Sequence, residues 1–403
     1  MLTRRSSWAL LGAGLAFGLL LGGGAGAYLD QAYPEYVPVI ALPGSRAAID
    51  SATYQQAVRV IESHYYGSLD SKKLTQGSVK GLVDGLGDPY SQFQTQQQFE
   101  QRQQDLSGRQ SGVIGITLNF NGDYPVITSI LPASPAQRAG LLARDTVVSI
   151  DGQDAKGVTA QKASTLIRGT VGTSVKLGIR RDSSTFDVTV ARETFTSPTV
   201  VSRRLDGNVL YLRVYQFGIN TATDFRSQLA AGLPGAKGVV LDLRENPGGL
   251  VDAAASVLSA FIPSGELFSV EDHGGHKDVR SSSGDHPAPA IPLYVLVDAN
   301  SASASEIVAG SLQERGRAKL VGVKTFGKGS VQEDYRLQDG SDIHLTIQHW
   351  YLPDGRSVIN NALQPDYEAA LGAPADMYDV ASPSVGYAGD TQLNRALDLI
   401  AAR

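Results

Sequence analysis

The chain contains no cysteine among its 403 residues. This absence excludes disulfide bonds, zinc sites built from thiolates and a thiol nucleophile. It also fits an oxidising compartment, where unpaired thiols are a liability. The formal net charge is −5, so the sequence lacks the excess of basic residues that nucleic-acid binding requires. We therefore expect no nucleic-acid partner.

Several familiar catalytic and metal-binding signatures are absent as well. Neither G-x-S-x-G nor H-E-x-x-H occurs. Residues 322–328 match the first part of a phosphate-binding loop, but Gly329 follows where that loop needs serine or threonine. His273 and His276 lie in a polar, proline-rich stretch over 273–290, where two histidines are more often solvated than bound to metal. The sequence predicts neither a metal nor a cofactor.

The N-terminus carries a pattern typical of export. Arg4 and Arg5 precede an apolar run without acidic residues from Trp8 to Leu21, and small residues follow up to Ala27. A basic start, an apolar stretch and a small-residue end are the parts of a signal peptide. The stretch is also long enough to span a bilayer. Residues 1–27 are therefore predicted to be either a cleaved signal peptide or a membrane anchor, with the protein in the periplasm or on the extracytoplasmic face of the cytoplasmic membrane.

Two regions come before the first strand-rich segment. Three prolines indicate an extended linker over 28–46, and helical patterns predict an N-terminal helical region over 47–105. The helices are expected over 47–65, 74–86 and a glutamine-rich stretch that ends near residue 105. The text GDPYSQF at 87–93 interrupts this pattern, and we interpret it as a helix breaker.

The composition then changes, and residues 106–193 read as a small domain of alternating strands. The texts GVIGITL, SPAQRAGL and DTVVSIDG follow one another, and a short amphipathic helix ends at Ile167. In that order the texts resemble a PDZ domain. The resemblance implies that a peptide C-terminus is captured by strand addition. It places the peptide-binding residues at Gly112, Val113, Ile114, Gly115, Ile116 and Arg168. The alternatives are a β-rich domain without a ligand and, for Arg168, an exposed cation at a helix end.

Residues 194–372 have the pattern of an α/β domain, and 373–403 form a helical C-terminal tail. Two buried strands, 238–244 and 292–298, each lead through a polar loop into a helix. Loops at the carboxyl ends of such strands meet at one edge of a sheet and commonly form the ligand-binding or active site. Gly248 and Gly249 leave backbone N–H groups free to approach a ligand, and a helix N-terminus supplies further donors. These are the parts of an oxyanion hole.

The loop at the second strand, NSASASEIVAG, allows two interpretations. Ser303 and Glu306 match the S-x-x-E capping box, in which the two side chains satisfy the first N–H groups of a helix. Alternatively, one serine is a nucleophile, which then needs a base beside it. No histidine is placed to serve. Lys328 is flanked by Gly327 and Gly329, and a buried lysine loses its proton more readily, so it is the candidate base.

Taken together, the ordered motifs resemble the carboxyl-terminal processing proteases, also called tail-specific proteases. The matching texts are GDPYSQF, the PDZ-like region, LDLRENPGGLVDAA, NSASASEIVAGSLQERGRAKLVGVKTFGKGSVQ, DGSDIHLTIQHWYLPDGRS and LQPD, which cover most of residues 50–370. The resemblance implies a crotonase-like α/β protease core, an inserted PDZ domain, and N- and C-terminal helices that often mediate dimers. It implies a serine endopeptidase that cuts proteins with suitable C-terminal tails.

The family also implies a role for each matched residue. By position, the nucleophile is Ser303, the base is Lys328, and Gln332 orients the lysine. The oxyanion donors would be the N–H groups of Gly249 and Ala304. Glu306 matches the family motif too, where capping accounts for it equally well. The chain departs from the family pattern in NNALQPD and in GSVQED, and neither departure touches the dyad.

Two other functions compete with a protease. The chain is an inactive PDZ scaffold of the cell envelope if its α/β domain has lost activity, but the intact set of serine, lysine and glutamine argues against this. The same sheet also serves acyl-CoA enzymes. An export segment and a PDZ insert argue against that alternative, because acyl-CoA is cytosolic.

Overall fold

The computed structural model describes residues 51–403 except 285–287, 289 and 360. The predicted export segment and linker, 1–46, lie outside these described residues. The chain divides into two units, residues 1–74 and 75–403. Helix α2 (Ser51–His64) belongs to the first unit, and α3 (Ser71–Asp84) begins there. Within the described part of the chain, no helix has both the length and the apolarity needed to cross a membrane.

A six-stranded sheet forms the centre of the second unit, in the order β10-β11-β12-β15-β16-β19. Its strands are β10 (Val200–Leu205), β11 (Val209–Val214), β12 (Gly238–Asp242), β15 (Leu293–Val297), β16 (Lys319–Gly322) and β19 (Tyr367–Glu368). All neighbours from β11 to β19 are parallel, and β10 is antiparallel to β11. The central strands β11, β12 and β15 are buried along their whole length, as expected for a parallel sheet covered on both faces.

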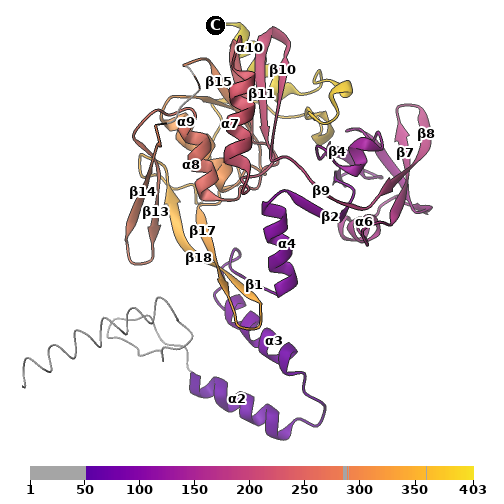
Figure 1. The fold of residues 1–403 in the computed structure, drawn as a ribbon, viewed down its shortest axis with the longest axis vertical. Coiled ribbons are helices and arrows are strands. Elements are labelled where there is room, and N and C mark those ends of the chain that lie inside the picture. Colours follow the sequence, from indigo (N-terminus) through magenta and orange to yellow (C-terminus); the bar gives the residue numbers. More distant parts are fainter. Residues whose placement is uncertain (1–50, 285–287, 289, 360) are drawn as a thin grey trace, which may run out of the picture. The chain divides into compact units, whose positions relative to one another are not determined.

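Helices cover both faces of this sheet. Alternate strand residues such as Leu241 pack with α7 (Thr221–Gly232), α8 (Val251–Ser259) and α9 (Ala304–Glu314) in one core (Figure 1). The intervening residues, such as Val240, pack with α10 (Thr391–Ala401) in another. Because successive strand side chains point to opposite faces, one apolar strand serves both cores.

A second, antiparallel sheet is built from five strands that come from different parts of the chain. It contains β1 (Gln92–Gln94), β13 (Glu266–Asp272), β14 (Lys277–Ser281), β17 (Ser330–Arg336) and β18 (Asp342–Tyr351). Strand β18 pairs with β1, β13 and β17. The polar, proline-rich composition of 273–290 predicts a loop, and this prediction is wrong for β14, which forms a hairpin with β13 around the two histidines (Figure 1).

The inserted β-rich domain has its own sheet and core. Its sheet contains β3 (Ile116–Asn119), β4 (Val126–Ile130), β5 (Thr146–Ile150), β6 (Gln153–Asp154), β7 (Ser174–Arg181) and β8 (Ser184–Ala191), with helices α5 (Pro135–Arg138) and α6 (Ala160–Ile167). The chain enters through β2 (Arg109–Val113) and leaves through β9 (Glu193–Thr196), which pair with each other (Figure 1). Helix α4 (Gln96–Leu106), capped by Thr95, precedes β2. An α/β core with an inserted β-rich domain is thereby confirmed.

The segment between β19 and α10 has only short helical turns. These are η3 (Pro374–Asp376) and η4 (Pro383–Val385), and a third such turn, η2 (Asp206–Asn208), joins β10 to β11. Despite this lack of regular structure, Met377, Tyr378 and Val380 are buried. The segment is therefore packed against its neighbours.

Candidate active site

The site begins where two neighbouring parallel strands end. Strands β12 and β15 are adjacent, so the loops that follow them, 243–250 and 298–303, meet at one sheet edge. The carbonyl of Asn246 accepts hydrogen bonds from Ala302 N at 3.1 Å and from Ser305 Oγ at 2.9 Å. The sequence expectation that these two loops come together is therefore confirmed.

Ser303 occupies a strained backbone position at the start of α9. Its φ and ψ are 55° and −117°, outside the regions that a residue with a Cβ normally adopts. Such a conformation costs free energy and persists only where the surroundings enforce it, which is commonly at functional sites. The Ser303 residue is 8% exposed and lines a cavity. Its side chain is thus held at the wall of this cavity by a sharp turn between strand and helix.

Glu306 joins the serine turn to the lysine loop. Its carboxylate accepts hydrogen bonds from Ser303 N at 3.0 Å, Gly327 N at 2.7 Å and Lys328 N at 2.8 Å. The hydroxyl of Thr325 donates to the same carboxylate at 2.6 Å. The residue is fully buried, and four donors satisfy its two oxygens. Capping of α9 is therefore one part of a larger connection between the two loops.

Two other serines of the same loop bond to carbonyl groups of the loop after β12 rather than to N–H groups at the start of α9. Ser301 Oγ donates to Leu243 O at 2.8 Å, and Ser305 Oγ donates to Asn246 O at 2.9 Å. Both hydroxyls therefore attach the loop to the end of β12. Ser303, which lies between them, is the serine that faces the cavity.

Lys328 lies in an environment that favours its neutral form. Burial lowers the pKa of Lys328, although the carboxylates of Asp88 and Glu306 act in the opposite direction. Its Nζ lies 5.0 Å from the centroid of the Tyr90 ring. Trp350 fixes the backbone at this point, because its indole N–H donates to Lys328 O at 2.9 Å. The lysine combines a fixed backbone with a lowered pKa.

Gln332 lies on β17 and lines the same cavity. Its amide nitrogen donates to Ser330 Oγ at 2.8 Å and to Thr346 Oγ1 at 3.0 Å. These bonds fix the side-chain plane. The amide nitrogen is therefore directed to two hydroxyls, and the predicted role of Gln332 in orienting Lys328 stays a prediction.

The two glycines predicted as part of an oxyanion hole are packed closely, Gly248 against the serine turn and Gly249 against the backbone of Phe217. Gly248 has a φ of 100°, and a Cβ there would lie 2.8 Å from Ser303 Cβ and 2.9 Å from Ala304 N. Gly249 has a φ of 137°, and a Cβ there would lie 2.2 Å from Phe217 O. Both positions therefore require glycine. Ala304 is the first residue of α9, so its N–H has no acceptor within the helix.

One cavity of about 380 Å³ brings the predicted site residues together. Ser303, Lys328, Gln332 and Gly249 all line it. Its remaining walls are apolar and charged side chains from α4, the glycine loop and the second sheet: Arg102, Leu106, Pro247, Leu250, Val251, Asp252, Val270, Arg280, Ser330, Val331, His344 and Gln348. The residues predicted as nucleophile and base thus share one space with Gly249, one of the two predicted oxyanion donors.

The PDZ-like domain has a separate groove between β3 and α6, of about 280 Å³. Five of the six predicted peptide-binding residues line it: Val113, Ile114, Gly115, Ile116 and Arg168. Gly112 does not, because its carbonyl accepts from Gly169 N at 3.0 Å and a Cβ there would strike Gly169 O. The groove is largely apolar, which suits an apolar peptide. Arg168 lies at its edge with Nε bonded to Ser164 Oγ at 3.2 Å.

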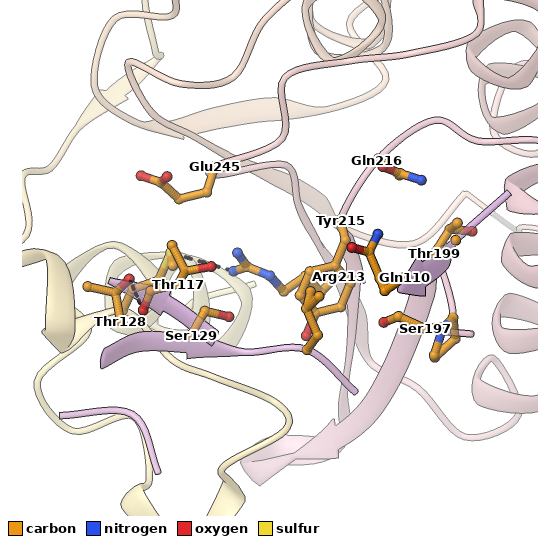
Figure 2. A pocket seen from close by; sticks show the side chains of 14 residues that line it. Gln110, Thr117, Thr128, Ser129, Ser197, Thr199, Arg213, Tyr215, Gln216 and Glu245 are labelled. Atoms are coloured by element: carbon orange, nitrogen blue, oxygen red, sulfur yellow. Dashed lines mark hydrogen bonds between the residues drawn. The ribbon is translucent and has the colours of Figure 1, made fainter. Parts of the chain in front are cut away.

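A third cavity, of about 150 Å³, lies where the PDZ-like domain meets the core. Thr117, Thr128 and Ser129 come from the inserted domain, and Arg213 and Glu245 from the core (Figure 2). Glu245 belongs to the loop after β12, on the way to the glycines. The cavity therefore brings residues of the inserted domain next to residues 243–250, the loop that carries the two glycines and is called the oxyanion loop for its predicted role.

Sequence reasoning missed a buried group of charges beneath this loop. Arg244 is fully buried and binds Asp242 through Nε at 2.9 Å and Asp390 through Nη2 at 2.9 Å. Burial alone would raise the pKa of Asp242, but the guanidinium groups of Arg244 and Arg213 outweigh it and hold the value at about 2. Asp390 lies far along the chain, so no local pattern links it to the site. The one local indication of this charge group is the motif LDLR, in which charged residues stand at the end of an otherwise apolar strand and so need buried partners.

Across the described residues, 51–403 without the five omitted positions, no group of three or more histidine, aspartate or glutamate residues is arranged to hold a metal ion.

Comparison with known proteins agrees with this geometry. A sequence model of peptidase family S41 matches residues 208–369, one of PDZ domains matches 126–181, and one of the N-terminal domain of the activating protease CtpB matches 44–98. The carboxy-terminal processing protease CtpA of Bacillus subtilis is 34% identical over 342 residues, covering 84% of this chain and 73% of the relative. A CtpA-like serine protease of Staphylococcus haemolyticus is 33% identical, covering 78% of this chain and 64% of the relative.

Solved structures show the same similarity. The photosystem II D1 C-terminal processing protease has 26% identity and a TM-score of 0.55, with 93% of this chain and 98% of the other covered. An S41 protease from Bacteroides fragilis shares the fold, with 18% identity, a TM-score of 0.61, and coverage of 90% and 99%. The chain therefore belongs to peptidase family S41: it is a serine-type peptidase with a PDZ domain, from the family that includes the carboxy-terminal processing proteases.

Proposed function

We propose that this peptidase is an endopeptidase that uses Ser303 as nucleophile and Lys328 as general base, and that it selects proteins by their C-terminal tails. The observation that carries the proposal is the single cavity lined by Ser303, Lys328, Gln332 and Gly249, in which burial lowers the pKa of the lysine. A serine hydroxyl is a weak nucleophile unless a base accepts its proton, and a neutral lysine amine can do so.

The first half of the reaction forms an acyl-enzyme. Neutral Lys328 takes the proton from Ser303 Oγ while that oxygen attacks the scissile carbonyl carbon. The negative charge that develops on the carbonyl oxygen is stabilised by the N–H groups of Gly249 and Ala304. The C–N bond then breaks, and the Lys328 ammonium returns its proton to the leaving amine. The acyl group remains on Ser303 as an ester.

The second half releases the acyl product. Lys328, neutral again, takes a proton from water, and the resulting hydroxide attacks the ester carbon. The lysine then returns the proton to Ser303 Oγ as the ester bond breaks. In this scheme Gln332, which lines the same cavity, orients the lysine, and Glu306 holds the loops of both reacting residues.

The PDZ domain supplies the selection of substrates. The proposal assigns residues 106–193 to this domain, 194–372 to the protease core, and 47–105 and 373–403 to the flanking helical regions. The groove beside β3 and α6 has apolar walls, and a peptide added along β3 would find free backbone partners there. An apolar C-terminal tail with a free carboxylate fits it, with Arg168 at the edge as the cation.

The same proposal places the protein outside the cytoplasm. Residues 1–27 have the composition of an export segment, either cleaved or retained as an anchor. N-terminal sequencing of the protein recovered from membrane and soluble envelope fractions distinguishes these two fates. A homodimer through the terminal helices is part of the proposal by family resemblance, and light scattering of the purified chain tests it.

The test of the catalytic assignment uses a peptide with an apolar C-terminal tail and the same peptide ending in an amide. Wild type is expected to cleave the free-acid form better, because only that form carries the carboxylate that a PDZ groove binds. Ser303→Ala and Lys328→Ala are expected to lower kcat/KM by about 10³-fold or more. Full activity in either variant contradicts the dyad.

The competing hypothesis, an inactive PDZ scaffold, makes a different prediction. A fluorophosphonate probe labels an activated serine covalently. Labelling of wild type that disappears in Ser303→Ala and in Lys328→Ala supports the peptidase, whereas unlabelled but peptide-binding wild type supports the scaffold.

A further inference from the structure

The aromatic ring of Tyr90 lies close to the amine of the candidate base, Lys328. The Lys328 Nζ lies 5.0 Å from the centroid of this ring, within the range at which an aromatic face attracts a cation. Tyr90 belongs to the text GDPYSQF, which the sequence analysis treated only as a helix breaker. It is half-buried, so its ring also covers part of the lysine from water.

The loop that carries Tyr90 is fixed to the strands that carry the site. Tyr90 N donates to Asp88 Oδ1 at 3.1 Å, and Ser91 Oγ donates to Asp88 Oδ2 at 2.5 Å. The same serine hydroxyl accepts from Thr346 N at 3.0 Å, and Thr346 Oγ1 in turn accepts from Gln332. Just beyond, β1 pairs with β18. Tyr90 is therefore held against the lysine by contacts with β18 rather than by its own side chain alone.

Several charged groups share the surroundings of Lys328. The anions that act on it are Asp88 from the same loop and Glu306 from α9. His344 on β18, whose pKa is lowered by burial, lines the same cavity, and its imidazole bonds Asp334. The cavity walls also carry Arg102, Asp252 and Arg280. None of these charged groups offers the Lys328 ammonium the aromatic face that the Tyr90 ring offers.

We propose that Tyr90 is a positioning residue for the general base, one that holds Lys328 against its ring and stabilises the ammonium formed when the lysine takes the serine proton. This inference rests on the proposed Ser303–Lys328 dyad. The electron-rich face of the ring attracts the ammonium but not the neutral amine, so its effect appears in the state that follows proton transfer. The ring also limits the orientations of a flexible lysine side chain before reaction.

The experiment compares Tyr90→Phe with Tyr90→Leu in the full chain. Phenylalanine keeps the aromatic face, whereas leucine keeps apolar bulk without it. The dependence of kcat/KM on pH is measured with the tailed peptide, together with the rate of Ser303 labelling by a fluorophosphonate. In Tyr90→Leu the value of kcat/KM on the high-pH plateau is expected to fall about 3- to 30-fold. Its acid limb is expected to move to lower pH, because the ammonium has lost a stabilising partner.

Tyr90→Phe is expected to stay within about twofold of wild type in plateau and limb, since the face is retained. Thermal unfolding identifies variants that fail to fold. If Tyr90→Leu fails to fold, Tyr90→Met is measured in its place. A lower plateau with an unmoved acid limb would indicate a purely structural role and overturn the inference. An equal loss in Tyr90→Phe would overturn it too.

Failure of this inference is distinguishable from failure of the dyad. Ser303→Ala and Lys328→Ala are measured in the same series. If both are inactive while Tyr90→Leu behaves like wild type, only the role of Tyr90 is wrong. If either of them stays active, the dyad itself is wrong.

Discussion

Glu306 links the two reacting residues through backbone N–H groups. Its replacement by glutamine tests the effect of the negative charge while the size of the side chain is kept. Glu306→Gln keeps the size but turns one acceptor oxygen into an NH₂ group that faces donors. We expect a loss of about 1–3 kcal/mol in the free energy of unfolding and at least a tenfold fall in kcat. Urea unfolding and peptide cleavage measure the two effects. Glu368→Gln, at an exposed glutamate on β19, is the matched control and should change neither.

Asp88 sets part of the pH dependence of the enzyme. Burial lowers the pKa of Lys328, and the Asp88 carboxylate partly opposes this by favouring the ammonium. Because the base must be neutral, activity rises as pH increases through the lysine pKa, which lies below the ordinary value for lysine. Asp88→Asn removes the opposing charge, so the pKa should fall further.

The acid limb of kcat/KM in Asp88→Asn is therefore expected to lie roughly half to one pH unit below that of wild type. Asparagine retains an oxygen for the N–H of Tyr90, which keeps the loop in place. A limb that moves to higher pH would contradict the assignment of this limb to Lys328.

At the scale of elements, the loop between β12 and α8 depends on a glycine that has no room for a side chain. A Cβ at Gly248 would lie 2.7 Å from Ala302 O and 2.8 Å from Ser303 Cβ. Gly248→Ala must therefore displace the oxyanion loop from the serine turn, and we expect kcat to fall about 10²-fold or more. Gly355→Ala is the control, because Gly355 also has a positive φ, of 82°, but open space around it.

Both substitutions share the cost of a positive φ, of about 1 kcal/mol, so thermal unfolding should show a loss in each. Only Gly248→Ala should lose activity beyond that. Equal activity in the two variants would mean that the close approach of this loop to Ser303 is unimportant.

The elements that sequence reasoning predicted well are those whose pattern is local. Strands β12 and β15 are continuous apolar runs followed by glycine or serine loops, and adjacency of parallel strands then brings Ser303 near Gly249. Strand β14 was missed because its residues alternate between half-buried and exposed, with a single apolar Val279, so nothing separates it from a polar loop.

The parts of the site that escaped prediction depend on partners distant in sequence. Arg244 is neutralised by Asp390, and Tyr90 reaches Lys328 only because β1 pairs with β18. Neither contact leaves a periodic signal in the chain. A helix-breaking motif such as GDPYSQF indicates where a helix ends, but the contacts that its side chains make depend on the tertiary structure.

At the scale of the whole second unit, the C-terminal segment connects the PDZ domain to the core. Asp379 Oδ2 accepts from Ile130 N of β4 at 3.1 Å, and Ser382 Oγ accepts from Ala143 N of the same domain at 3.2 Å. On the core side, Tyr378 N donates to Asp390 Oδ2 at 2.7 Å, the carboxylate that neutralises Arg244. The PDZ domain is thus attached, through one short segment, to the charges beneath the oxyanion loop.

Asp379→Ala is predicted to loosen this attachment without unfolding either domain. Burial raises the pKa of Asp379, yet it is the acceptor for a buried backbone N–H, and its removal leaves that N–H without a partner. The expected cost to docking is about 1–3 kcal/mol, which corresponds to hydrogen exchange at Ile130 faster by about tenfold or more. Asp376→Ala removes a half-exposed contact of 3.9 Å to Arg144 and the acceptor of Ala373 N, at 2.9 Å, but no bond to Ile130. It should therefore leave exchange at Ile130 nearly unchanged. If Ile130 exchanges at the wild-type rate in Asp379→Ala, the PDZ domain is held by its linking strands β2 and β9 instead, and the C-terminal segment has no part in coupling it to the site.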